Sequence, residues 1–178
     1  MLRVLALAAV LTFGVALPAG AQTAPEPESS SGGGPANTLT GRCSYAGPLV
    51  FERPIGGVPE QNSMWFATRG SCSGFLDGRR IDDEPVRFWG FGSGLMSCEQ
   101  GLPNGPGALA VGDAVIPFTF SELRVTGGGK TRFAGSRGGS LDGVGATSDD
   151  PAELVERCLA NAVERVSIYG EVAGTISG

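Results

Sequence analysis

Apolar and polar residues alternate along much of the chain, and glycine interrupts the alternating segments at short intervals. In MWFATR, residues 64–69, the even positions would share one face of a strand and the odd positions the other. The chain has 30 glycines, which weaken helices and suit tight turns. The pattern therefore predicts an all-β domain with mainly antiparallel pairing.

The expected strands are short and closely spaced. They cover residues 39–46, 48–53, 62–69, 72–77, 79–83, 86–92, 107–116, 118–126, 130–137, 139–147 and 165–176. Near residue 121 the alternation changes phase, because even-numbered apolar residues from Ile116 to Phe120 give way to Leu123 and Val125. A bulge of one inserted residue would cause this change and bend the strand. Bent strands suit a closed or strongly coiled sheet, so we expect a small β-barrel-like domain.

One segment, DDPAELVERCLANAV from residue 149, predicts a helix. Asp150 can cap its N-terminus, Pro151 fits the first helical position, and Glu153 stands where a capping box places its acid. An apolar face follows, made of Leu154, Val155, Cys158, Leu159 and Ala162. We expect one short C-terminal helix before the last strand, with Cys158 directed toward the sheet.

The N-terminal region has the composition of an export signal followed by a tether. Arg3 precedes an apolar run over residues 4–17, and Ala19-Gly20-Ala21 offers a cleavage site. The run is shorter than the ~20 residues that span a bilayer. Residues 22–38 contain Pro, Ser, Gly and acid but no large apolar residue. The sequence therefore predicts a signal peptide (1–21), a disordered tether (22–38) and a single domain (39–178), secreted in soluble form with no later transmembrane segment.

All four cysteines, Cys43, Cys72, Cys98 and Cys158, lie in the predicted exported domain. An even number of cysteines in an oxidising compartment indicates two disulfides. Three pairings are open. Chain order favours Cys43 with Cys72 and Cys98 with Cys158, because each bridge then joins neighbouring cysteines.

The chain contains no histidine. This absence removes histidine-dependent nucleophiles, histidine acid–base catalysis and imidazole metal ligation. Carboxylate chemistry, serine–lysine chemistry through Lys130 and oxygen-ligated calcium remain. With no recognisable catalytic or metal motif, we expect a non-catalytic protein without metal or cofactor. The net charge of −5 argues against a nucleic-acid partner.

One short stretch recurs: GSCSGFLDG at residues 70–78 and GSRGGSLDG at 135–143. Two facing aspartates, Asp77 and Asp142, could share a proton and act as acid and base. Asp-Gly is also a favoured pair for a two-residue hairpin turn. We favour two hairpins, in which Leu76 pairs with Arg79 and residue 141 pairs with residue 144.

Exposed aromatic residues would be the best candidates for ligand binding. Alternation in VRFWGFG places Phe88 on one face of a strand and Trp89 with Phe91 on the other, so one side must be core. Trp65, Trp89, Phe91 and Arg87, flanked by Arg69, form the candidate ligand-binding set. Packing in the core is the interpretation we favour over recognition, because large aromatics are ordinary core residues in a domain of this size.

Three functions are compatible with these patterns. The favoured one is a secreted non-catalytic barrel that binds a small apolar or amphipathic ligand, or a cell-envelope component, in its mouth. The second is an extracellular protein-interaction module, such as a protease inhibitor. The third is a glycoside hydrolase that draws two carboxylates from Asp77, Asp142, Glu52, Glu99 or Glu122.

Overall fold

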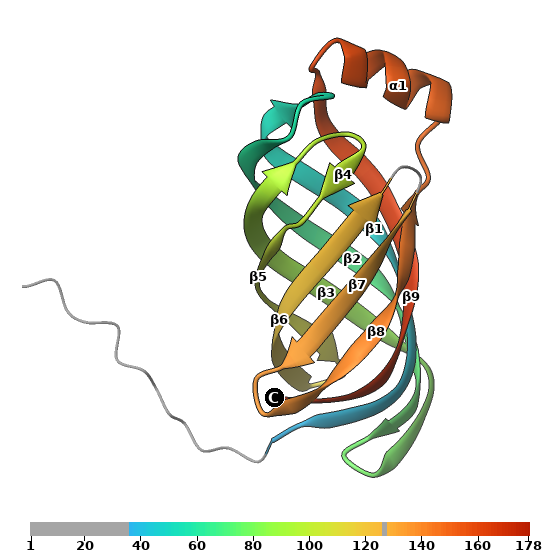
Figure 1. Cartoon of the computed structure of the whole chain (residues 1–178). Helices are drawn as coiled ribbons and strands as arrows, with labels where there is room; N and C mark the ends of the chain where they lie inside the picture. Colours follow the sequence, from blue (N-terminus) through green and yellow to red (C-terminus); the bar gives the residue numbers. More distant parts are fainter. Residues whose placement is uncertain (1–35, 126–127) are drawn as a thin grey trace, which may run out of the picture. The chain divides into compact units, whose positions relative to one another are not determined.

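The structure is a computed structural model that describes residues 36–125 and 128–178. The described residues form nine strands and one helix (Figure 1). The elements are β1 (Thr38–Ile55), β2 (Glu60–Leu76), β3 (Arg79–Met96), β4 (Gln100–Gly101), β5 (Asn104–Val111), β6 (Ala114–Val125), β7 (Gly128–Gly135), β8 (Gly138–Thr147), α1 (Pro151–Leu159) and β9 (Val163–Ser177). No helix in this part of the chain is long and apolar enough to cross a membrane. The predicted signal peptide, 1–21, and residues 22–35 of the predicted tether lie outside the described residues.

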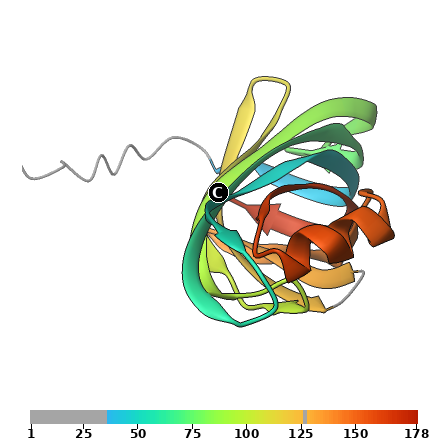
Figure 2. The ribbon, with the colours of Figure 1, turned by 90° about the horizontal axis from the view of Figure 1, so that it is seen from above.

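Eight of the described strands close into an antiparallel barrel. Each long strand pairs with the next along the chain, and β9 pairs with β1 to complete the circle (Figures 1 and 2). The short β4 adds a ninth strand between β3 and β6 at one end. This architecture confirms the predicted fold class, including the helix before the last strand.

The first three strands are about twice as long as the sequence predicts. β1, β2 and β3 contain 18, 17 and 18 residues, and each joins two predicted strands into one. At Gly41, Gly70 and Gly74 an added Cβ would lie 2.2, 1.9 and 2.1 Å from a carbonyl oxygen of the neighbouring strand. These glycines therefore permit the close approach of two strands. Frequent glycines in a sequence are otherwise a sign of turns, which is why the predicted strands are shorter.

The predicted bulge near residue 121 is wrong. β6 pairs with β7 from Phe118 opposite Gly135 to Val125 opposite Gly128, with no shift of register. Irregular pairing occurs elsewhere: the β2–β3 register shifts between Cys72 and Gly74. The turn between β5 and β6 also lies earlier than predicted, because β5 ends at residue 111 and β6 begins at residue 114.

The first copy of the repeated stretch forms the predicted hairpin. Asp77 and Gly78 have φ angles of 52° and 77° between β2 and β3, and Leu76 pairs with Arg79. Positive φ at both central positions is the geometry that favours Asp-Gly in a two-residue turn. The Asp77 side chain also accepts a hydrogen bond of 2.6 Å from the backbone N–H of Thr38.

The predicted turn at the LDG of the second copy is wrong, because Leu141, Asp142 and Gly143 lie within β8. Leu141 does not pair with Val144; Asp142 instead lies opposite Arg132 of β7 and Ala173 of β9. The turn comes earlier, between the end of β7 at residue 135 and the start of β8 at residue 138. The same three residues, Leu-Asp-Gly, thus lead into a turn at 76–78 and form part of an extended strand at 141–143.

Apolar side chains fill the interior of the barrel. A cluster of aromatic rings occupies its centre: Tyr45, Phe66, Phe88, Phe118, Phe120 and Phe133. The ring centroid of Phe133 lies 4.8 Å from that of Phe118 and 5.4 Å from that of Phe88. An eight-stranded barrel has an interior just wide enough for its own side chains, and this one uses that space for packing.

Two disulfides join the cysteines in the pairing that chain order favours. Cys43 and Cys72 lie directly opposite each other on β1 and β2, with a Cα–Cα distance of 4.1 Å, and are buried inside the barrel. Cys98, just after β3, is bonded to Cys158 of α1 across a Cα–Cα distance of 6.1 Å. The second bridge ties the helix to the end of the barrel.

We expect Gly143→Ala to lower the free energy of unfolding by about 2 kcal/mol, because overpacking forces strands apart. The new Cβ would lie 1.8 Å from the Glu171 carbonyl oxygen of β9. Gly57→Ala is the matched control, since a Cβ there meets nothing within 4 Å. Urea denaturation of both variants measures the difference. Equal stability of the two would contradict the close approach of β8 and β9.

Thr68 is 2% exposed, and its hydroxyl has no hydrogen-bond partner among the described residues. A buried unpaired hydroxyl is costly, so Thr68→Val should raise the free energy of unfolding by about 1 kcal/mol. Thr40→Val is the control, because the exposed Thr40 hydroxyl bonds that of Thr175. Thermal unfolding that shows a lower melting temperature for Thr68→Val would overturn this expectation.

Candidate functional site

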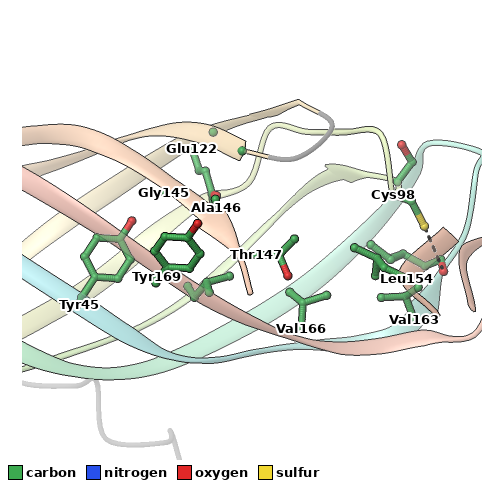
Figure 3. Close-up of a pocket in the computed structure, with 15 residues that line it drawn as sticks. Tyr45, Cys98, Glu122, Gly145, Ala146, Thr147, Leu154, Val163, Val166 and Tyr169 are labelled. Atoms are coloured by element: carbon green, nitrogen blue, oxygen red, sulfur yellow. Dashed lines mark hydrogen bonds between the residues drawn. The ribbon is translucent and has the colours of Figure 1, made fainter. Parts of the chain in front are cut away.

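Helix α1 lies across one end of the barrel (Figure 2), and a small cavity lies at that end (Figure 3). Its volume is about 60 Å³. Residues from β1, β6, β8, β9 and α1 line it, among them Tyr45, Glu122, Thr147, Leu154, Val166 and Tyr169. This is the place where the sequence analysis locates a ligand, the mouth of the barrel.

The hydroxyl end of Tyr45 reaches this cavity through a gap left by two glycines. Gly145 of β8 and Gly170 of β9 lie opposite each other. A Cβ on either glycine would lie only 2.7 or 2.5 Å from the Tyr45 hydroxyl oxygen. The glycines therefore make room for a buried tyrosine, and the tyrosine fills space that a ligand would need.

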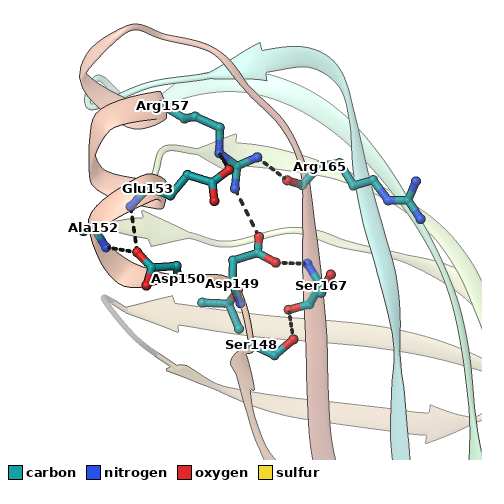
Figure 4. A network of polar contacts seen from close by, with 9 residues as sticks. Ser148, Asp149, Asp150, Ala152, Glu153, Arg157, Arg165 and Ser167 are labelled. Atoms are coloured by element: carbon teal, nitrogen blue, oxygen red, sulfur yellow. Dashed lines mark hydrogen bonds and ion pairs between the residues drawn. The ribbon is translucent and has the colours of Figure 1, made fainter.

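Helix α1 is fixed over the cavity by its cap and by a polar network (Figure 4). As predicted, Asp150 caps the helix, accepting hydrogen bonds from the backbone N–H groups of residues 152 and 153. Asp149 accepts from Ser167 of β9 at 3.1 Å and from Arg157 of α1 at 3.3 Å. Arg157, in the last turn of the helix, also donates a hydrogen bond of 3.3 Å to the Arg165 carbonyl oxygen of β9, so the helix is bonded to β9 near both of its ends.

Only part of the predicted apolar face of α1 packs inward. Leu154 and Cys158 pack against the core. Val155 and Leu159 are exposed, because the nine-residue helix lies across the end of the barrel and presents one narrow stripe to it.

The cavity is too small for an ordinary ligand. Pockets that bind drug-sized molecules measure about 300–1,000 Å³, whereas 60 Å³ holds a few waters. This cavity therefore lacks the room that the expected small-molecule ligand would need. A wider opening of about 390 Å³ shares Ile55 with it and is lined by residues that include Arg53, Val58 and Asn161.

The five candidate catalytic carboxylates do not meet in this cavity. Glu122 is the sole carboxylate among its described lining residues. Asp77 lies in the β2–β3 turn, and Glu52 and Glu99 are exposed. Glycosidases need two carboxyl groups about 5–10 Å apart in one cleft, so the described cavity lacks the required pair.

The described residues also include no group of three or more acidic or cysteine side chains placed to hold a metal ion.

Asp142 is held as an ionised carboxylate on the outer surface. The side chain of Arg132 donates a hydrogen bond of 2.5 Å to one of its oxygens, and Ser140 donates one of 2.6 Å to the other. The hydrogen bond from Arg132, followed by that from Ser140, keeps the pKa of Asp142 below its ordinary value. A carboxyl group in this setting is a poor proton donor near neutral pH.

The predicted aromatic candidates lie together on the outside of the barrel. Trp65, Trp89 and Phe91 are 46%, 41% and 54% exposed, whereas Phe88 is 1% exposed inside the barrel. Trp65 of β2 lies directly opposite Phe91 of β3, and Trp89 is two residues away on the same face. Alternation therefore separates core from surface as predicted, with Phe88 in the core and the other three aromatics outside.

Two arginines form the next row of the same surface. Arg69 of β2 lies directly opposite Arg87 of β3, and both side chains are exposed. Each lies two residues from the row that contains Trp89, a separation of about 7 Å along a strand. We call the five residues Trp65, Trp89, Phe91, Arg69 and Arg87 the aromatic face.

The aromatic face includes an open groove of about 410 Å³. Its lining residues are Ala67, Thr68, Arg69, Arg87, Phe88 and Trp89. Ala108 and Ala110 of β5, the cross-strand neighbours of Trp89 and Arg87, are small and nearly buried although they point away from the barrel interior. They lie beside the groove and do not line it. The sequence identified the aromatic and arginine positions, but their placement beside these alanines depends on strand pairing.

Comparisons of the chain with protein-family models, with curated protein sequences and with solved structures find no match. The geometry of the chain itself is therefore the basis for assigning the site.

Adjacent residues of β3 should respond to truncation in opposite ways. Phe88→Ala should lower the free energy of unfolding by about 3–5 kcal/mol, because it removes a fully buried ring from the central cluster. Trp89→Ala should lower it by only about 1 kcal/mol, because that ring is partly exposed to solvent. Chemical denaturation monitored by circular dichroism compares the two. A large loss for Trp89→Ala would assign Trp89 to packing and remove it from the candidate site.

Proposed function

We propose that this protein is an exported, non-catalytic interaction module that binds a partner protein through the aromatic face. Export is supported by the predicted signal peptide and by two disulfides, which are typical of oxidising compartments. Of the functions that the sequence leaves open, the protein-interaction module agrees best with a packed interior and an aromatic outer surface.

The composition of the aromatic face carries this proposal. Two tryptophans, one phenylalanine and two arginines are exposed side by side on β2 and β3. Tryptophan and arginine are enriched among the residues that dominate binding energy at protein interfaces. A large exposed apolar patch is uncommon on a monomeric protein unless it binds something.

The outer surface of β1, β9, β8 and β7 has a different chemistry. There the hydroxyls of Thr40 and Thr175 are 3.0 Å apart, and Arg132 and Ser140 both bond the carboxylate of Asp142. These polar groups bond one another within the barrel wall, although Val144 of β8 and Tyr169 of β9 are also exposed on that side. The aromatic face differs in bringing two tryptophans and a phenylalanine together with two arginines.

The test is capture of partners from the exported fraction of the producing cells by the full-length chain with both disulfides formed. We expect the triple variant Trp65→Ser/Trp89→Ser/Phe91→Ser to bind the captured protein at least 100-fold more weakly, because truncation of one hot-spot residue costs about 2 kcal/mol or more. Calorimetric titration of the purified pair measures the affinity.

The matched control is Val144→Ser/Val155→Ser/Leu159→Ser, which removes three exposed apolar side chains outside the aromatic face. It should bind the partner as the unmodified chain does. Equal affinity of the aromatic-face variant and this control would refute the proposed function.

A further inference from the structure

The two arginines of the aromatic face are unusual neighbours. Arg69 and Arg87 are directly opposite across β2 and β3, an arrangement in which like charges destabilise a sheet. Neither guanidinium makes an ion pair or a hydrogen bond with another described side chain. The whole chain carries a net charge of −5. An acidic protein thus displays two adjacent uncompensated cations beside its exposed aromatic rings.

The backbone around the groove is already fully engaged in the sheet. β3 pairs with β2 on one side and with β5 on the other, and β5 pairs in turn with β6. A partner segment therefore cannot add as a further strand, because strand addition needs an open edge. A partner at the aromatic face would therefore be contacted through side chains and not through added strand pairing.

An extended segment that binds without strand pairing must keep its own backbone solvated. Polyproline II is the conformation that does so, and aromatic-lined grooves bind proline-rich segments in this form. The groove offers one exposed indole, that of Trp89, beside its small cross-strand neighbour Ala67, and both arginines also line it. Carboxylates on such a segment could form ion pairs with the guanidinium groups of Arg69 and Arg87. A planar guanidinium can donate two parallel hydrogen bonds to one carboxylate.

We propose that the occupant of the aromatic face is an acidic, proline-containing extended segment of the partner protein, with its carboxylates on Arg69 and Arg87. This inference rests on the proposed function, since it names the partner chemistry of the same surface. A second copy of the chain fits less well, because a symmetric contact would place the same arginine pair on both sides of the interface.

The probe is a fluorescently labelled peptide of repeating Pro-Glu, titrated into the full-length oxidised chain and followed by anisotropy. A Pro-Lys peptide tests the charge, and a Gly-Glu peptide tests the need for proline. Polygalacturonate and vesicles of anionic phospholipid are added as competitors that carry the same charge on a glycan or a membrane.

The matched variants change the same number of charges at two places. Arg69→Gln/Arg87→Gln should weaken binding of the Pro-Glu peptide at least tenfold, and added salt should weaken binding to the unmodified chain. Arg79→Gln/Arg80→Gln, at exposed arginines just after the β2–β3 turn, should leave the affinity unchanged.

Four results would overturn the inference: no binding of the Pro-Glu peptide, equal binding of the Pro-Lys or Gly-Glu peptide, equal loss in the two arginine variants, or tighter binding of polygalacturonate or anionic vesicles. The capture experiment separates this failure from failure of the proposed function. If capture depends on the three aromatics but not on Arg69 and Arg87, the interaction module stands and the acidic segment does not. If capture depends on neither, both are wrong.

Discussion

Packing around Phe133 is the interaction on which the rest of this structure depends. Its ring contacts those of Tyr45, Phe66, Phe88 and Phe118, which come from four other strands. Eight strands enclose a space only as wide as such side chains. The barrel therefore cannot close without packing these rings against one another in its centre. The interior provides stability, and little of it remains for a ligand.

A filled and closed barrel leaves its outer surface as the place for recognition. Closure of β1 on β9 removes the sheet edges that other all-β proteins use for strand addition. Helix α1, bonded to the barrel through Cys158 and Asp149, lies across one end of it. Side chains on the outside of the strands are then the groups that can meet a partner. Most of the large exposed aromatics among the described residues lie on β2 and β3, whereas Tyr169 lies on β9.

The candidate site follows from a simple property of strands. Phe88 and Trp89 are adjacent in sequence, yet one belongs to the central cluster and the other to the aromatic face. Period-two alternation made this separation predictable, as it did the all-β class. The barrel itself was expected from a bulge near residue 121 that β6 does not contain. The helix cap at Asp150 was also predictable, because capping is decided by local residues.

The sequence by itself determined the all-β class, the helix before the last strand, and which aromatics share a face, because alternation and capping are local. Tertiary structure decided which of those faces is buried and that Arg69 meets Arg87, because both depend on pairing between distant strands. Tertiary structure also determined the local conformation of each of the two LDG segments. The same residues turn at Asp77 and remain extended at Asp142, where β7 and β9 flank the strand and supply its backbone partners.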